Sequence, residues 1–338
     1  MKVYFFESSP LIKTAWQSTV SDLDTVWVEG MLTLASVGNH TDAEIICTDM
    51  SILDATCLSA FKRLKLIAVR ATGVDNVDLE YCHEKGITVC NVPAYARTAV
   101  AEHVFALLLA LGRHVVEASR RTRRLDFSWT DIQGFELFAK TLAVVGAGAI
   151  GRRVAEIAKG FGMVVVAVDS FPDEPWATAN KVSYLPLDDA LRRADVVSLH
   201  VPGIPETRHL ISAERFELMK KGVVIINTSR GDVLDAQALL GALTSGKVAG
   251  AGLDVLPEEN DLMAEYTRLE FLNRSRADCA TQLTNHLLLQ HPRVLVTPHC
   301  AFFTKEAAAR LMQITVDNIT AFIKGDDLIN VVQKELPE

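Results

Sequence analysis

One stretch of this chain constrains its fold more than any other: TLAVVGAGAIGRRVAEIAKGFGMVVVAVD, residues 141–169. An apolar run leads into three glycines spaced G-x-G-x-x-G, a helical pattern follows, and a second apolar run ends in an aspartate. This order predicts a strand, a glycine turn, a helix and a second strand. The stretch begins only after 140 residues, so an equally long segment must have another task.

The glycine turn has the features of a dinucleotide site. Gly146 permits the turn, Gly148 lets a pyrophosphate approach the backbone, and Gly151 lets the helix pack on the strand. Asp169 ends the second strand, where its carboxylate can accept hydrogen bonds from the adenosine ribose and repels a 2′-phosphate. No arginine follows directly in DSFPDEP, so the sequence favours NAD over NADP.

The same alternation of strands and helices covers most of the chain. We predict strands at 2–6, 43–48, 65–70, 87–92, 141–146, 163–169, 196–202, 222–229, 248–255 and 293–299. Helices are expected at 59–64, over one long apolar stretch at 98–121, and at 305–325. Near-continuous apolar strands are typical of parallel sheets covered on both faces, and 338 residues suit two domains. The predicted fold is therefore α/β, with two Rossmann-like domains built on doubly wound parallel sheets.

Charge and cysteine content exclude several partners. A net charge of −8 argues against nucleic acid and anionic membranes, and the basic cluster at 120–124 is interpreted as a solvated or subunit-facing helix end. The six cysteines form no C-x-x-C pair and no metal-ligand spacing with histidines, so no metal is expected. Because no apolar segment has membrane-spanning length, we expect a cytoplasmic protein.

Three side chains in the second half have the chemistry for hydride transfer at a carbonyl. Arg230, Glu259 and His299 each follow a predicted strand. An arginine fork binds carboxylate and carbonyl oxygens, a histidine exchanges a proton near neutral pH, and a nearby glutamate raises its pKa. Each also has a purely structural interpretation, as an ion-pair partner, a solvated loop carboxylate or a strand cap. Their joint order after a nucleotide fingerprint favours a catalytic set.

The motifs VGAGAIG with Asp169, LHVPGIPET, NTSRGDVLD, LDVLPEE and TPHCAF together resemble the D-isomer-specific 2-hydroxyacid dehydrogenase family. The resemblance implies that an NAD-binding domain, residues 100–300, is inserted in a substrate (catalytic) domain built from residues 1–99 and 301–338. It therefore explains why the glycine turn begins late. It also implies a homodimer, with the helix that begins near Thr98 as its contact.

The resemblance assigns roles residue by residue. Arg230 is the substrate-binding arginine, His299 the acid/base and Glu259 its partner, while the backbone of Thr72 and Gly73 holds the substrate carboxylate. The residues implied to bind NAD are Gly146, Gly148, Ala149, Ile150, Gly151, Asp169, Val201, Pro202, Thr207, Thr228, Ser229, Arg230 and Asp254.

The nearest branch in this resemblance is that of D-lactate dehydrogenases. Tyr95 and Phe302 match residues lining a small pocket, which favours reduction of pyruvate to D-lactate. Phe303 replaces a frequent tyrosine, Arg97 beside the pocket could accept a second acidic group, and the segment between Glu259 and His299 is long. The alternatives are a hydroxypyruvate, glyoxylate or other 2-keto acid reductase of the same family, and a corepressor-like protein that senses NAD(H).

Overall fold

The chain divides into two units, and the glycine turn at residues 146–151 lies in the second of them. The computed structural model describes residues 1–8, 10–259 and 276–332. It separates into two compact units, Met1–Ala96 with Phe303–Glu338, and Arg97–Phe302. The divisions lie three and two residues from the boundaries expected after residues 99 and 300.

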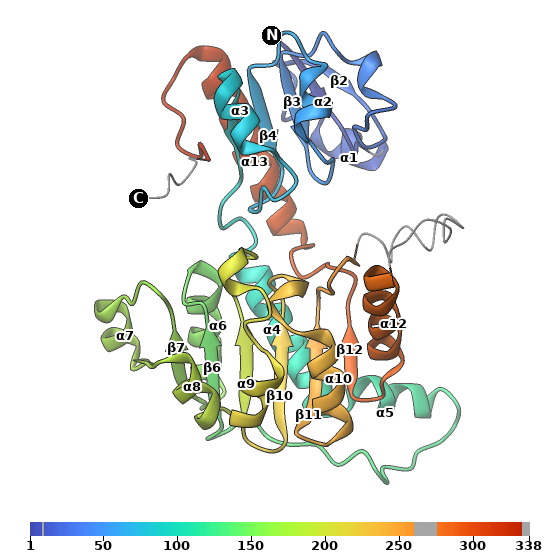
Figure 1. Cartoon of the computed structure of the whole chain (residues 1–338), viewed down its shortest axis with the longest axis vertical. Coiled ribbons are helices and arrows are strands. Elements are labelled where there is room, and N and C mark those ends of the chain that lie inside the picture. Colours follow the sequence, from blue (N-terminus) through green and yellow to red (C-terminus); the bar gives the residue numbers. More distant parts are fainter. Residues whose placement is uncertain (9, 260–275, 333–338) are drawn as a thin grey trace. The chain divides into compact units, whose positions relative to one another are not determined.

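The first unit is built on a five-stranded parallel sheet in the order β2-β1-β3-β4-β5 (Figure 1). Its strands are β1 (Lys2–Phe5), β2 (Asp24–Trp27), β3 (Ile45–Thr48), β4 (Leu66–Val69) and β5 (Thr88–Cys90). The helices are α1 (Pro10–Trp16), α2 (Ala55–Ser59), α3 (Leu79–Lys85) and α13 (Lys305–Lys324), with a 3-10 turn, η1, at Val37–Asn39. Side chains of α2 and α3 join the buried cluster on one face, and those of α13 join the cluster on the other.

The helix expected at residues 59–64 is wrong. The structure places α2 one turn earlier, because the Asp54 carboxylate accepts a hydrogen bond from the Cys57 N–H and so caps a helix that starts at Ala55. Helix α2 ends at Ser59. The helix was expected partly from the apolar residues Phe61 and Leu64. Both are buried, but they lie in the loop that leads to β4.

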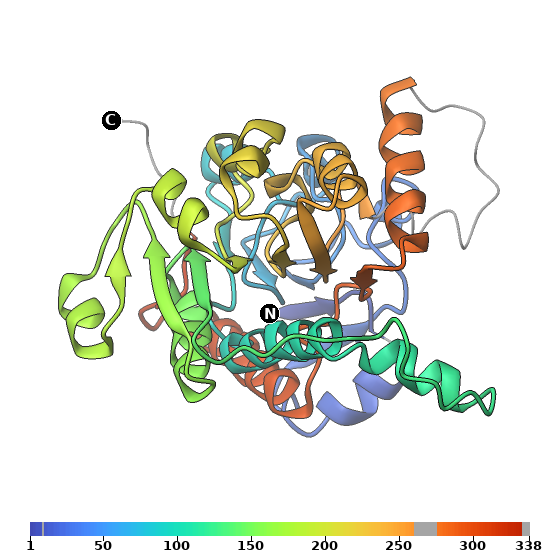
Figure 2. The ribbon, with the colours of Figure 1, turned by 90° about the horizontal axis from the view of Figure 1, so that it is seen from below.

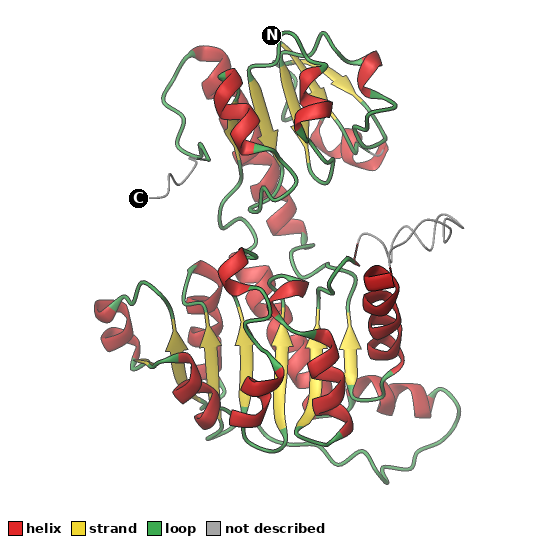
Figure 3. Cartoon of the chain, in the orientation of Figure 1, coloured by secondary structure: helices red, strands yellow, loops and turns green. Residues whose placement is uncertain are grey.

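The second unit holds a seven-stranded parallel sheet in the order β12-β11-β10-β9-β6-β7-β8, and the strands alternate with helices along the chain (Figure 3). The strands are β6 (Thr141–Val145), β7 (Val164–Val168), β8 (Ser183–Tyr184), β9 (Val196–Leu199), β10 (Val223–Asn227), β11 (Val248–Leu253) and β12 (Val294–Val296). These two sheets confirm the predicted α/β fold class.

Helices cover both faces of this sheet, as Figure 2 shows from below. One buried cluster joins the sheet to α8 (Leu187–Arg193), α9 (Ala213–Leu218), α10 (Ala236–Thr244) and α12 (Arg276–Gln290). The opposite cluster joins it to α4 (Arg97–Gly112), α6 (Ala149–Gly160) and α7 (Glu174–Asn180). The remaining elements are α5 (Val115–Thr122) and the 3-10 turns η2 (Pro205–Thr207) and η3 (Gly231–Val233).

The single long helix expected over residues 98–121 is also wrong, because α4 and α5 meet at a bend of 59°. Gly112 is the last residue of α4, and its carbonyl accepts a hydrogen bond from the Phe135 N–H. Two residues later, His114 adopts a left-handed φ of 48° before α5 begins. Within the described residues no single helix is long and apolar enough to cross a membrane. The bent pair of α4 and α5 has the length and the composition for a broken membrane span, and nothing more supports one.

Candidate active site

The candidate residues of the second unit gather at one edge of its sheet. Each follows the carboxyl end of a parallel strand: β6, β7, β9, β10, β11 or β12. In the strand order, β6 lies between β7 and β9, so the chain leaves β6 to one side and later returns to the other. Ligands of open α/β sheets bind at such a switch point, outside the carboxyl ends of the strands.

Two of the three glycines in the turn after β6 leave no room for a side chain, and the third lies in open space. Gly146 has a φ of 95°, and a Cβ there would lie 2.6 Å from the His200 carbonyl oxygen. A Cβ on Gly151 would lie 1.9 Å from the carbonyl oxygen of Gly146. At Gly148 nothing lies within 4 Å of a Cβ, and this residue begins α6 without a side-chain cap. The amides of the first turn of α6, around Ala149 and Ile150, therefore suit a phosphate group.

Asp169 braces the glycine turn from the end of β7. Its Oδ2 accepts a 2.7 Å hydrogen bond from the Ala147 N–H, and its Oδ1 accepts one of 2.9 Å from the Phe171 N–H. Each carboxylate oxygen can accept more than one hydrogen bond, so both can still accept from ribose hydroxyls. The turn, the open helix end and this carboxylate together fit a dinucleotide.

The remaining residues expected to bind NAD differ in what their side chains do. The Thr207 hydroxyl bonds within its own loop, to the Pro202 carbonyl at 2.6 Å, so it shapes the segment that carries Val201. The Ser229 hydroxyl donates to Asn227 Oδ1 at 2.8 Å and shapes the turn after β10. The Thr228 hydroxyl is buried and lacks a hydrogen-bond partner within the described part of the chain.

His299 and Glu259 form a close pair although 40 residues separate them. The His299 Nδ1 lies 2.5 Å from Glu259 Oε1, and Glu259 Oε2 accepts the Leu256 N–H at 3.3 Å. Because the Glu259 carboxylate accepts this hydrogen bond, it raises the pKa of His299, and the charge of Asp254 acts the same way, whereas burial and the charge of Arg230 lower it. With Nδ1 held, the protonated imidazole presents its second N–H, at Nε2, for proton transfer.

The turn that carries His299 is held by Asp254, whose side chain is 1% exposed. Asp254 Oδ1 accepts the Cys300 N–H at 3.0 Å and Oδ2 accepts the Ala301 N–H at 2.9 Å. The Thr297 hydroxyl donates to Oδ1 at 2.5 Å. His299 itself has a φ of 49°, a left-handed conformation that a histidine adopts only when its surroundings impose it.

Arg230 reaches the same region from the turn after β10. Its side-chain stem packs over Gly203, where a Cβ would lie 2.8 Å from Arg230 Cγ. Its neighbour Gly231 approaches the loop after β11 so closely that a Cβ would lie 2.1 Å from the Leu256 carbonyl carbon. Arg230 lies close enough to His299 for its charge to lower the histidine pKa. Arg230, Asp254, Glu259 and His299 are thus brought together within one unit.

The four expected substrate residues fall in both units. Phe302 lies in the second unit, with its ring edge-on to His299 at 6.3 Å between centroids. Thr72, Gly73 and Tyr95 lie in the first unit, where the Thr72 hydroxyl donates to the Val92 carbonyl at 3.0 Å. In the described structure neither backbone N–H of Thr72 and Gly73 donates a hydrogen bond, which leaves both for an anion. Part of the long segment after Glu259, residues 260–275, lies outside the described residues.

His103 was not found from the sequence. It projects from α4, and its Nε2 lies 3.0 Å from the Thr297 hydroxyl and 3.5 Å from Asp254 Oδ1. The Cys300 sulfur lies within 4.8 Å of the ligand atoms of both His103 and Asp254. The sequence separation of 151 residues between His103 and Asp254 gives no spacing signal, so only the packing of α4 on the sheet reveals the contact.

Comparisons with known proteins show which family and which fold this chain is similar to. The family model described as "D-isomer specific 2-hydroxyacid dehydrogenase, NAD binding domain" matches residues 105–301. A D-lactate dehydrogenase of Escherichia coli is 39% identical over 267 residues, 79% of this chain and 78% of its own. A glyoxylate reductase of Aeropyrum pernix is 36% identical over 312 residues, 90% of this chain and 86% of its own. The crystal structure of the Aquifex aeolicus D-lactate dehydrogenase with NAD and lactic acid superposes with a TM-score of 0.86 at 38% identity, covering 96% of each chain.

Proposed function

The chain belongs to the D-isomer-specific 2-hydroxyacid dehydrogenase family, and from that premise we propose that it reduces pyruvate, or a similarly small 2-keto acid, to the D-2-hydroxy acid. It is an NAD-dependent oxidoreductase of 2-hydroxy and 2-keto acids. The observation that carries the finer proposal is the hydrogen bond between His299 and Glu259, which raises the pKa of a half-buried imidazole and so favours its charged form.

In the proposed reaction NADH supplies the hydride to the carbonyl carbon. Arg230 binds the substrate carboxylate through its guanidinium fork, which fixes the keto group in one orientation. His299 donates its Nε2 proton to the carbonyl oxygen, and Glu259 holds the imidazole at Nδ1 and stabilises its positive charge. In the reverse direction neutral His299 accepts the hydroxyl proton.

The first unit is proposed as the substrate domain and the second as the NAD-binding domain. The amides of Thr72 and Gly73 lack hydrogen-bond partners in the described structure, which suits a carboxylate oxygen. The ring of Phe302, edge-on to His299, supplies apolar surface, which suits the methyl group of pyruvate better than a charged substituent. The resemblance assigns Tyr95 of the first unit to the substrate as well. Glyoxylate is the second candidate, because a relative 36% identical to this chain is a glyoxylate reductase.

The test is the initial rate of NADH oxidation with pyruvate, glyoxylate, hydroxypyruvate, 2-ketobutyrate, oxaloacetate and phenylpyruvate, each repeated with NADPH. We expect the highest kcat/KM with pyruvate and NADH, and D-lactate as the product on a chiral column. A clear preference for glyoxylate or hydroxypyruvate would replace the pyruvate assignment. NADH binding without turnover of any keto acid would favour a protein that senses NAD(H).

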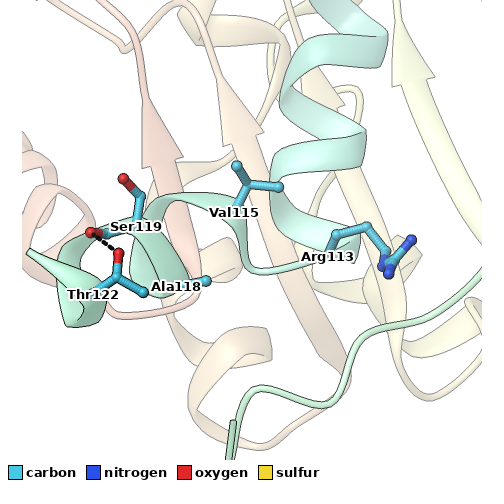
Figure 4. Close-up of a pocket in the computed structure, with 5 residues that line it drawn as sticks. All are labelled: Arg113, Val115, Ala118, Ser119 and Thr122. Carbon is cyan, nitrogen blue, oxygen red and sulfur yellow. Dashed lines mark hydrogen bonds between the residues drawn. The ribbon is translucent and has the colours of Figure 1, made fainter. Parts of the chain in front are cut away.

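We also propose a homodimer whose contact is formed by α5 and the segment after it. In α4 the apolar side chains are mostly buried in its own unit, whereas large apolar side chains near α5 are exposed. These are Val115, Val116, Leu125, Phe127 and Trp129, with exposed fractions of 54%, 55%, 84%, 75% and 83%. A shallow depression beside them is lined by Arg113, Val115, Ala118, Ser119 and Thr122 (Figure 4).

A surface of this kind fits a second copy of the same chain. Light scattering after size exclusion should give twice the mass of one chain. A variant with Leu125→Ser and Trp129→Ser should elute as a monomer, and a wild-type monomer would refute the proposal.

A further inference from the structure

Three side chains with different donor atoms meet behind the His299 turn. They are His103 from α4, Asp254 after β11 and Cys300 after β12. One nitrogen, one carboxylate oxygen and one sulfur all lie within 4.8 Å of one another. All three residues belong to the second unit.

The distances suit a tetrahedral metal ion. Nitrogen and oxygen ligands about 2.0–2.2 Å from zinc are about 3.4 Å apart at a tetrahedral edge. The His103 Nε2 and Asp254 Oδ1 are 3.5 Å apart, so both can bind one ion almost without moving. A thiolate sulfur and a nitrogen or oxygen ligand of zinc are about 3.6 Å apart at a tetrahedral edge. The Cys300 sulfur lies within 4.8 Å of the other two ligand atoms, so it needs to approach them by at most about 1 Å.

The donor set also selects the type of metal. Magnesium and calcium prefer oxygen ligands, whereas a thiolate with an imidazole suits zinc. The group has three protein ligands, so a water molecule would complete the coordination. Asp254 is almost fully buried and the His103 side chain is 21% exposed, which places the group at the edge of the protein interior with one open side.

We propose that this chain binds one Zn²⁺ through His103 Nε2, Asp254 Oδ1 and the Cys300 thiolate, and that the zinc-bound form is inactive. The Cys300 thiol proton is released to solvent, and no oxidation state changes. The His103 proton must move to Nδ1, because the Thr297 hydroxyl donates to Asp254 and therefore accepts from Nε2 in the metal-free state.

Inactivation follows from what Asp254 does without metal. Its Oδ1 accepts the Cys300 N–H and the Thr297 hydroxyl, two of the bonds that hold the His299 turn. A zinc ion competes for the same oxygen and draws the Cys300 side chain toward itself. Because Cys300 directly follows His299, the imidazole loses its orientation. The inhibitory half of the proposal, that zinc inactivates the enzyme, rests on the proposed function, whereas the zinc-binding half does not.

Binding is tested on the full chain, stripped of metal and kept reduced. Zn²⁺ alone is titrated against a chromophoric chelator, and Co²⁺ replaces zinc for absorption spectra. We expect one zinc per chain and a near-ultraviolet thiolate-to-cobalt charge-transfer band. Loss of an outer-shell partner already weakens metal binding about 10–100-fold, so Cys300→Ser should weaken zinc binding at least about 10-fold and abolish the band. His103→Gln should weaken binding similarly but keep the band.

The matched control is Cys279→Ser, since Cys279 is exposed on α12 and lies outside the group. It should bind zinc as the wild type does. Equal zinc affinity in the Cys300→Ser variant, or a cobalt complex without the band, would overturn the site.

Inhibition is measured against each protein's own zinc-free rate of NADH oxidation. Wild-type and Cys279→Ser proteins should lose activity as zinc saturates, with recovery on adding a chelator, while Cys300→Ser should resist. Zinc bound through Cys300 without loss of rate would overturn the inhibitory half. A zinc-free chain inactive on every keto acid would instead refute the proposed function, and the cobalt band would still decide the site.

Discussion

Replacing Glu259 by glutamine tests the pairing on which the proposed mechanism depends. The substitution keeps the shape of the side chain and a hydrogen-bond acceptor for His299 Nδ1 and removes the charge. It also replaces the oxygen that accepts the long 3.3 Å bond from the Leu256 N–H by an amide group. Hydrogen bonds to charged groups contribute about 1.5–3 kcal/mol and neutral ones about 0.5–1.5 kcal/mol. The His299 side chain is 36% exposed and that of Glu259 27%, so solvent screens the pair. The two ranges differ by up to about 2.5 kcal/mol. For this screened pair we take a loss of about 1.4 kcal/mol, which is tenfold in the equilibrium between charged and neutral imidazole.

The sign of the pH effect follows from the raised pKa of His299. Reduction needs the imidazolium, so kcat/KM for the keto acid is full below that pKa and falls as the pH rises through it. In Glu259→Gln the fall should begin at lower pH, and kcat/KM at a pH above the wild-type transition should be about tenfold lower. Oxidation of the hydroxy acid should gain activity at correspondingly lower pH.

The assay is stopped-flow or steady-state NADH absorbance across pH 5–10 for both directions. Glu258→Gln is the matched control, because Glu258 is adjacent and is not among the groups that shift the His299 pKa. It should leave both transitions in place. If Glu259→Gln also leaves them in place, Glu259 does not stabilise the imidazolium and the reasoning fails.

Three further substitutions test the other parts of the site. His299→Ala should lower kcat about 10²-fold or more with unchanged NADH affinity by fluorescence titration, and normal turnover would remove His299 as the acid/base. Arg230→Lys should raise the KM for the keto acid because the guanidinium fork is lost, and an unchanged KM would place Arg230 outside the substrate site. Gly151→Ala should strongly weaken NADH binding, since its Cβ would lie 1.9 Å from the Gly146 oxygen, whereas Gly160→Ala at the open end of the same helix should not.

Local patterns in the sequence predicted the strands of the second unit well. Each of these strands is a short apolar run that is recognisable from its own residues and the turn that follows it. The sequence therefore predicted β6, β7, β9, β10, β11 and β12. The edge strands β2 and β8 were not predicted, because each is short and only partly buried. The bend between α4 and α5 depends on Phe135, which is 23 residues from Gly112 and gives no local signal.

The candidate site was predictable only where its residues follow strands. Arg230, Glu259 and His299 were expected for their position and chemistry, and the second unit brings them close together. The hydrogen-bond network behind them was not expected. Asp254 was assigned to NAD binding by resemblance, and the structure adds that both of its oxygens accept hydrogen bonds from the backbone after His299. Such a contact depends on how β11 and β12 align, which spacing cannot reveal.

The position of His299 requires this network. A left-handed histidine stores strain of order 1–3 kcal/mol, which persists only where several contacts fix the backbone. The His299 N–H donates to the carbonyls of Asp254 and Thr297, both at 2.9 Å, and the next two amides donate to the Asp254 carboxylate. With the backbone held in this way, the imidazole contacts Glu259, and the side chain of the following residue, Cys300, lies near Asp254 and His103. The turn that orients the proposed acid/base therefore also assembles the proposed zinc ligands, so metal binding and the orientation of His299 depend on the same Asp254 carboxylate.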